Sequence, residues 1–151
     1  MPITRDLKIL EKEFHDFCAR RQEVILAYLF GSLVSRKTGP VNDIDLAILV
    51  APDGLQTLDQ TDPYGYRAQM TAALAQLLRC DRIDLVVLNE ASPPLLRQVV
   101  GKGKLIYCIS EAERIRFEIT ALKKHADTAH LRGIKRLYMR KRIEKGLTAY
   151  V

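Results

Sequence analysis

The seven consecutive apolar residues Val24–Phe30 constrain the fold of this 151-residue chain more than any other feature. A strand that is apolar at every position has to be covered on both faces, because it offers no polar side for water. Gly31 and Ser32 end the run abruptly. We therefore expect a sheet built around Val24–Phe30, with other elements packed on both of its faces.

Helical and extended patterns alternate along the rest of the chain. Apolar spacing and helix-start signals predict helices over residues 5–21, 63–79, 93–100 and 111–122. Short apolar runs predict further strands over residues 43–50, 82–88 and 104–109. The polar segment 51–62, which contains Pro52 and Gly54, is expected to be a loop. Together these elements predict an α/β (α+β) fold, a small mixed β-sheet covered by helices.

The composition favours one globular domain. Its 48% hydrophobic and 28% charged residues are ordinary for such a domain. The longest apolar run, of seven residues, is too short to span a bilayer. Three widely spaced cysteines argue against a disulfide framework and against a cysteine-based zinc site. We expect a cytoplasmic protein without membrane contact, made of one domain over residues 1–151. Its catalytic core spans about 22–110, and a helical extension follows over about 110–151.

Basic residues are concentrated at the C-terminus. Residues 123–151 hold nine of the 24 Lys and Arg but only two of the 18 Asp and Glu, so this segment has a net charge of +7 and the rest of the chain −1. Leu131, Ile134, Leu137 and Tyr138 recur at helical spacing within it. A basic C-terminal helix of this kind can dock a protein partner, bind nucleic acid or pack on its own domain. We favour docking of a protein partner, and nucleic acid remains the alternative.

One candidate site begins where the buried strand ends. Gly31 and Ser32 are followed by ten residues and then by Asp43-Ile44-Asp45. A glycine lets the backbone approach a ligand closely, and a turn that opens a helix binds phosphate through its exposed N–H groups. Asp43 and Asp45 are two apart on a strand, so both side chains leave the same face. Paired carboxylates of this kind are suited to Mg²⁺.

A third carboxylate, Asp84, interrupts the apolar strand predicted over residues 82–88. A buried carboxylate without a partner is costly. If this strand neighbours the Asp43 strand, Asp84 completes a three-carboxylate cluster able to hold two metal ions. Each part also has an ordinary explanation, such as a tight turn or an ion pair with Arg82. Their combination favours a functional site.

The combined pattern of Gly31-Ser32, Asp43-Ile44-Asp45 and Asp84 resembles the signature of the DNA polymerase β-type nucleotidyltransferase superfamily. The resemblance covers residues 24–122. It is strongest to the minimal nucleotidyltransferases of the MntA type, which are antitoxins of HEPN-domain toxins. It implies the nucleotidyltransferase fold, with two Mg²⁺ ions on Asp43, Asp45 and Asp84. The nucleotide would be bound by residues of the turn, namely Gly31, Ser32 and Arg36.

The resemblance also implies an activity. An ATP-dependent transfer of AMP to a hydroxyl is expected, with a tyrosine of a cognate HEPN toxin as the acceptor. Two alternatives stay open: a non-catalytic module that only masks its toxin, and an adenylyltransferase that acts on a small molecule or on RNA.

Overall fold

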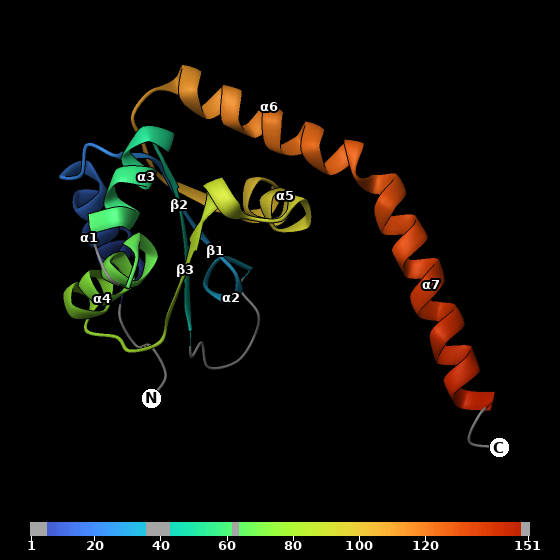
Figure 1. Cartoon of the computed structure of the whole chain (residues 1–151). Helices are drawn as coiled ribbons and strands as arrows, with labels where there is room; N and C mark the ends of the chain where they lie inside the picture. The colour runs from blue at the N-terminus through green and yellow to red at the C-terminus, as the bar shows by residue number, and fades with distance from the viewer. Residues whose placement is uncertain (1–5, 36–42, 62–63, 149–151) are drawn as a thin grey trace.

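The computed structural model describes residues 6–35, 43–61 and 64–148 (Figure 1). Its elements are α1 (Leu7–Ala19), β1 (Val24–Phe30), α2 (Ser32–Ser35), β2 (Ile44–Val50), α3 (Pro52–Thr61), α4 (Tyr66–Leu78), β3 (Ile83–Val87), the 3-10 turn η1 (Leu88–Glu90), α5 (Pro93–Lys102), β4 (Lys104–Cys108), α6 (Glu111–Asp127) and α7 (Ala129–Thr148). The four predicted strands are present in the predicted order, which confirms the mixed α+β class.

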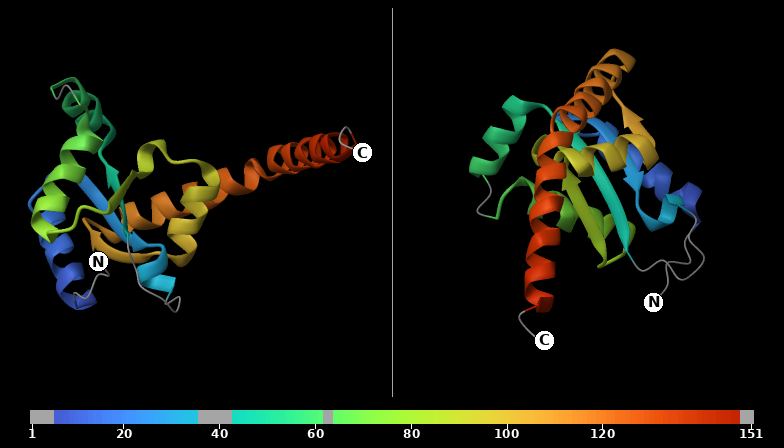
Figure 2. Two further views of the ribbon diagram at one scale, coloured as in Figure 1. Left: turned by 90° about the horizontal axis from the view of Figure 1, so that it is seen from below. Right: turned by 90° about the vertical axis from the view of Figure 1, so that its right-hand side faces the viewer.

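The strands form one mixed sheet in the order β3-β2-β1-β4. β1 runs antiparallel to both β2 and β4, whereas β2 and β3 are parallel. Helices α1 and α4 cover one face of the sheet, and α5 and α6 lie on the other (Figures 1 and 2). The apolar strand β1 therefore lies inside the sheet and is covered on both sides, as its sequence requires.

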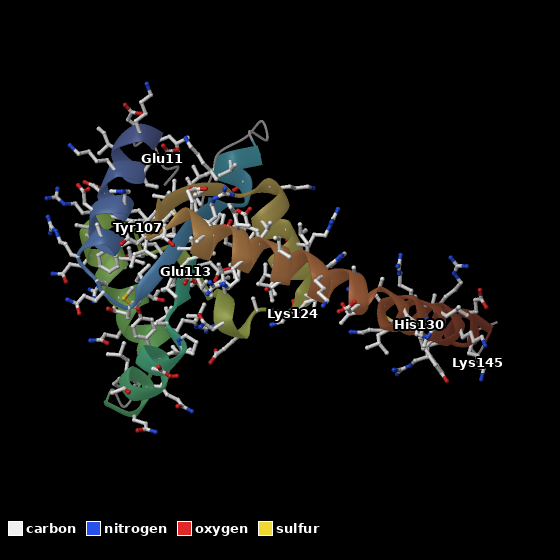
Figure 3. All side chains as sticks on the ribbon, turned by 90° about the horizontal axis from the view of Figure 1, so that it is seen from above. Glu11, Tyr107, Glu113, Lys124, His130 and Lys145 are labelled. Atoms are coloured by element: carbon white, nitrogen blue, oxygen red, sulfur yellow. The ribbon has the colours of Figure 1, made fainter. Side chains whose placement is uncertain are left out.

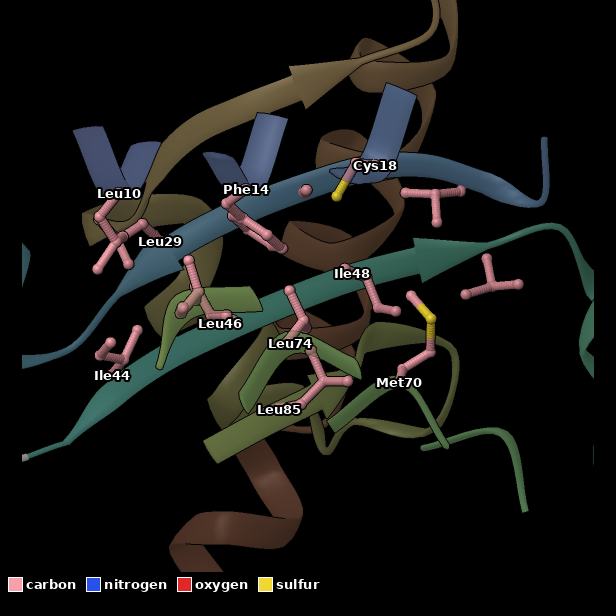
Figure 4. Close-up of a cluster of buried hydrophobic side chains, with 14 of the residues drawn as sticks. Leu10, Phe14, Cys18, Leu29, Ile44, Leu46, Ile48, Met70, Leu74 and Leu85 are labelled. Carbon is pink, nitrogen blue, oxygen red and sulfur yellow. The ribbon is translucent and has the colours of Figure 1, made fainter. Parts of the chain in front are cut away.

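The two faces of β2 have different roles. Ile44, Leu46 and Ile48 are buried in the larger core cluster, where they meet the helices α1 and α4 (Figure 4). Ala47, between them, belongs to the second cluster, on the side of α5 and α6. Because side chains alternate along a strand, Asp45 leaves the sheet on the same side as Ala47. This alternation sets the face on which the candidate site lies.

The expectation of a loop over residues 51–62 is wrong, because α3 occupies Pro52–Thr61. Proline fits the first position of a helix, where its missing N–H breaks no helical hydrogen bond. Leu55 and Leu58, three residues apart, pack against the larger core cluster. This packing stabilises the helix, although the composition of the segment is mostly polar. The predicted helix start at residues 62–63 lies outside the described residues, and α4 begins at Tyr66.

The predicted start of α6 is confirmed. Ser110 is the N-cap, and its side chain accepts a hydrogen bond from the backbone N–H of Glu113 at 3.2 Å. The helix runs to Asp127, five residues beyond its predicted end. Across the junction with α7, the Arg132 guanidinium donates to the His125 carbonyl at 2.7 Å and to the Thr128 hydroxyl at 2.6 Å. These bonds fix the direction in which α7 leaves α6.

Helix α7 projects away from the rest of the molecule (Figures 1 and 2). Its side chains extend around the whole helix, with His130 near its start and Lys145 near its far end (Figure 3). Six large apolar residues of α7 are at least 41% exposed, namely Leu131, Ile134, Leu137, Tyr138, Met139 and Ile143. The helix therefore does not pack its apolar residues on its own domain. Among the described helices, none is long and apolar enough to cross a membrane.

Candidate functional site

Asp45 and Asp84 lie side by side on neighbouring strands. They are register partners in the parallel pair of β2 and β3. Residues in register on adjacent strands point to the same face of a sheet, so both carboxylates leave the face that carries α5 and α6. Asp43 precedes β2 by one residue and is two positions from Asp45. The structure thus brings the three predicted aspartates to one end of one face.

The exposure of the three carboxylates decreases toward the centre of the sheet. Asp43 and Asp84 are exposed, and Asp45 is intermediate. The cost of a buried, unpaired carboxylate therefore does not arise at Asp84. β3 is at the edge of the sheet, and Asp84 is its second residue. A carboxylate in this position keeps its contact with water and needs no buried partner.

Gly31 makes room for Asp45. The residue has a φ of +76°, a conformation that side chains disfavour. A Cβ atom added to Gly31 would collide with Oδ2 of Asp45. The register agrees, because Phe30 pairs with Asp45 across β1 and β2. Glycine is therefore required both by the backbone turn and by the aspartate beside it.

Ser32 opens the short helix α2 directly after this turn, and its side chain is half-buried. The backbone N–H of Val34 donates to the Gly31 carbonyl at 3.2 Å, which closes the turn next to Asp45. Arg36, the third residue predicted to contact the nucleotide, lies outside the described residues. Of the residues predicted to bind the nucleotide, Gly31 therefore lies against the Asp45 carboxylate, and Ser32 follows it as the first residue of α2.

The carboxylates affect one another electrostatically. The pKa of Asp45 is raised above its ordinary value, chiefly by burial and further by the negative charges of Asp84 and Asp43. A bound cation would offset this repulsion, and carboxylate oxygens are the ligands that Mg²⁺ prefers. No three His, Cys, Asp or Glu side chains of the described residues are close enough to share one ion. The residue types fit a divalent cation, but their side chains do not form a ready-made cage.

Two of the hollows that the described residues line bear on this face of the sheet, and Asp84 contributes to one of them. The larger one, about 550 Å³, lies between α3, α5 and α6 at the opposite end of β2. A smaller groove of about 230 Å³ follows the free edge of β3 and includes Asp84. Its other side chains come from β3 itself, from α4, and from η1, α5 and the two residues between them, and no sequence motif assigned them to a site. The half-buried Leu95 on α5, for example, has the spacing of an ordinary core residue.

Comparison with known proteins agrees with this arrangement. Residues 12–112 match the family described as "Polymerase beta, Nucleotidyltransferase". The chain is 34% identical over 108 residues to the protein adenylyltransferase MntA of Shewanella oneidensis, covering 72% of this chain and 68% of the relative.

Solved structures are similar to this chain over most of its length. A chain from a crystal structure of a toxin–antitoxin with AMP-PNP matches with a TM-score of 0.66 and 26% identity, covering 88% of this chain and 98% of the other. A chain from the complex of the tri-AMPylated Shewanella oneidensis HEPN toxin with its MNT antitoxin matches with a TM-score of 0.64 and 26% identity, covering 90% and 98%.

Proposed function

Because this chain belongs to the polymerase β-type nucleotidyltransferase family, we propose that it transfers AMP from ATP to a hydroxyl of a partner protein. The observation that carries the proposal is the register pairing of Asp45 with Asp84 beside Gly31. This pairing supports the proposal, because carboxylates suit cations and a glycine turn that opens a helix suits phosphates. We propose that residues 1–151 act as one domain, in the cytoplasm.

The roles of the residues follow from their positions. Asp43, Asp45 and Asp84 would hold two Mg²⁺ ions, whose charge offsets that of the triphosphate and of the developing transition state. Gly31 and Ser32, with Arg36, would bind the β- and γ-phosphates. The acceptor oxygen forms a bond to the α-phosphorus, its proton passes to Asp84, and the bond to pyrophosphate breaks. Most of the rate enhancement would come from positioning and charge neutralisation.

The acceptor we propose is a tyrosine hydroxyl of a cognate HEPN-domain toxin, which makes this chain an antitoxin. The support is the likeness to MntA and to a structure that contains a tri-AMPylated HEPN toxin. The projecting helix α7 adds a surface that a small-molecule modifier would not need. RNA and small molecules are the alternative acceptors.

A masking module is the second candidate, since an antitoxin can act by covering its toxin alone. Helix α7, with its six exposed apolar residues, would suit that function. The acidic face argues for catalysis, because the mutual repulsion of the carboxylates brings no benefit to a protein that only masks a partner.

Labelled ATP distinguishes these functions. The chain is co-expressed and co-purified with a HEPN-domain toxin as its proposed partner, and the complex is incubated with Mg²⁺ and ATP labelled in either the α- or the γ-phosphate. We expect the partner to retain the α-label and the γ-label to leave with pyrophosphate. Asp45→Asn should abolish the labelling. Retention of the γ-label would indicate a kinase, and neutralisation of the toxin by Asp45→Asn would indicate masking.

A further inference from the structure

We propose that the groove along the free edge of β3 is the acceptor subsite and that it receives an aryl hydroxyl, the side chain of a tyrosine. The inference rests on the proposed function, since it assumes that the carboxylates and Gly31 form a transfer site. Six side chains define the subsite: Arg67, Asp84, Val86, Glu90, Ser92 and Leu95.

The order of the strands indicates the side of the site from which the acceptor approaches. In an in-line displacement, the attacking and leaving oxygens lie on opposite sides of the phosphorus. The turn proposed to hold the leaving pyrophosphate follows β1, which lies on one side of β2. Asp84 is on β3, on the other side of β2. The acceptor therefore approaches from the β3 side, where the edge of the sheet is free and the groove begins.

The lining of the groove suits an aromatic ring with a hydroxyl at its end. Val86 and Leu95 are half-buried and pack against the core cluster on this face, so they form a fixed apolar floor. Asp84 lies two residues before Val86 on the same strand and on the same face. A ring lying on Val86 and Leu95 can point its hydroxyl toward Asp84, which would accept the proton.

The charges around the groove disfavour a nucleic acid. Asp84 and Glu90 bring two carboxylates to it, and among the described residues that line it Arg67 is the single basic side chain. The phosphates of an RNA acceptor would meet negative charge there, whereas binding of RNA is driven by neutralisation with Lys and Arg. Among the acceptors considered above, a protein tyrosine therefore fits the groove best.

The first test measures binding without turnover. The protein, with its Leu and Val methyl groups isotopically labelled, is titrated with N-acetyl-tyrosinamide and, separately, with uridine. We expect N-acetyl-tyrosinamide to shift the methyl signals of Leu95 and Val86 and to leave that of Leu77, on α4, in place. Shifts of Leu95 and Val86 with uridine instead would make a ribose hydroxyl the acceptor. Absence of shifts at both residues with N-acetyl-tyrosinamide would overturn the proposal.

The second test uses the transfer reaction with the co-purified partner protein. Leu95→Trp fills the groove, and we expect the KM for the partner to rise about tenfold, the effect of losing one well-packed contact. The KM for ATP should stay unchanged. Leu77→Trp is the matched control on the opposite face of the sheet. Leu95→Ala, which opens the groove without blocking it, should give a smaller rise.

The outcomes separate this inference from the proposed function. If the wild-type protein transfers label and Leu95→Trp retains the wild-type KM for the partner, the subsite is wrong while the function stands. If the wild-type protein transfers no label, the proposed function fails, and the methyl shifts still decide whether the groove binds an aryl hydroxyl.

Discussion

Asp45 and Asp84 occupy equivalent positions on two parallel strands, so that two carboxylates emerge side by side from one face of the sheet. Parallel pairing matters here, because it keeps neighbouring strands in the same direction and brings their first residues to the same end. Asp43, which precedes β2, joins them there. Repulsion between these carboxylates destabilises the folded state in the absence of cations. The same carboxylates are well placed to bind divalent cations.

The repulsion predicts a gain in stability when Asp45 is neutralised. Its pKa is raised in the folded state, so stability falls as the pH rises from the ordinary value of 3.8 through the raised value. Asp45→Asn should therefore unfold at a higher urea concentration than the wild type at pH 7. The difference should vanish at pH 3, where Asp45 is protonated in both states. Asp81→Asn, an exposed acid in the turn before β3, should show no such gain.

Glycine at position 31 should be irreplaceable. Gly31→Ala forces a side chain into a positive φ and against the Asp45 carboxylate, and we expect a loss of about 1–2 kcal/mol of stability. Transfer activity should fall as well, since Asp45 has to move. Gly101→Ala is the matched control, because a Cβ there meets nothing within 4 Å in helix α5. Urea unfolding of both variants measures the difference, and equal stability would contradict the assigned role of Gly31.

Tyr28 should contribute to stability without contributing to transfer. Its hydroxyl, in the middle of β1, donates to Oε1 of Glu118 at 2.9 Å and so ties the sheet to α6. Oε2 of Glu118 remains paired with Arg114 at 2.9 Å when the hydroxyl is removed. Tyr28→Phe should therefore cost only about 1 kcal/mol, measured by thermal unfolding, with unchanged transfer rates. Tyr138→Phe, exposed on α7, should have no effect on either.

Deletion of α7 from Leu131 onward should weaken binding of the partner protein and leave the nucleotide site intact. The apolar side chains of α7 are exposed, so the remaining domain should keep its melting temperature and its binding of Mg²⁺ and ATP. Transfer to the partner protein should fall with the loss of affinity for it. Unfolding of the truncated protein would mean that α7 belongs to the core. Salt-sensitive binding of RNA, lost on truncation, would assign the basic helix to nucleic acid instead.

The sequence predicts the strands and the acidic motif well, because both depend on local patterns. Seven apolar residues in succession specify a buried strand, and Asp43 and Asp45 share a face wherever their strand lies. The position of Asp84 depends instead on which strand ends the sheet. Strand order is set by tertiary contacts, so its exposure could not be read from the apolar residues around it.

Helix α3 and the groove beside Asp84 could not be predicted from the sequence, because both depend on tertiary packing. Pro52 and Gly54 are ordinary loop residues by composition, and only the packing of Leu55 and Leu58 on the core explains the helix. Val86 and Leu95 follow the pattern of core residues. Their place beside Asp84 follows only from the fold, which packs η1 and α5 next to β3. No signal within a single element marks them.

The free edge of β3 also bears on how inactive variants of this protein should be made. An edge strand presents unpaired backbone groups to any other strand, and short length and charge are what discourage such pairing. β3 has five residues, and Asp84 supplies its charge. Asp84→Asn would remove a proposed catalytic group and also the charge that keeps the edge from self-association. Asp45 lies on an interior strand, so its substitution does not expose a free strand edge. Asp45→Asn is therefore the better inactive variant for trapping complexes.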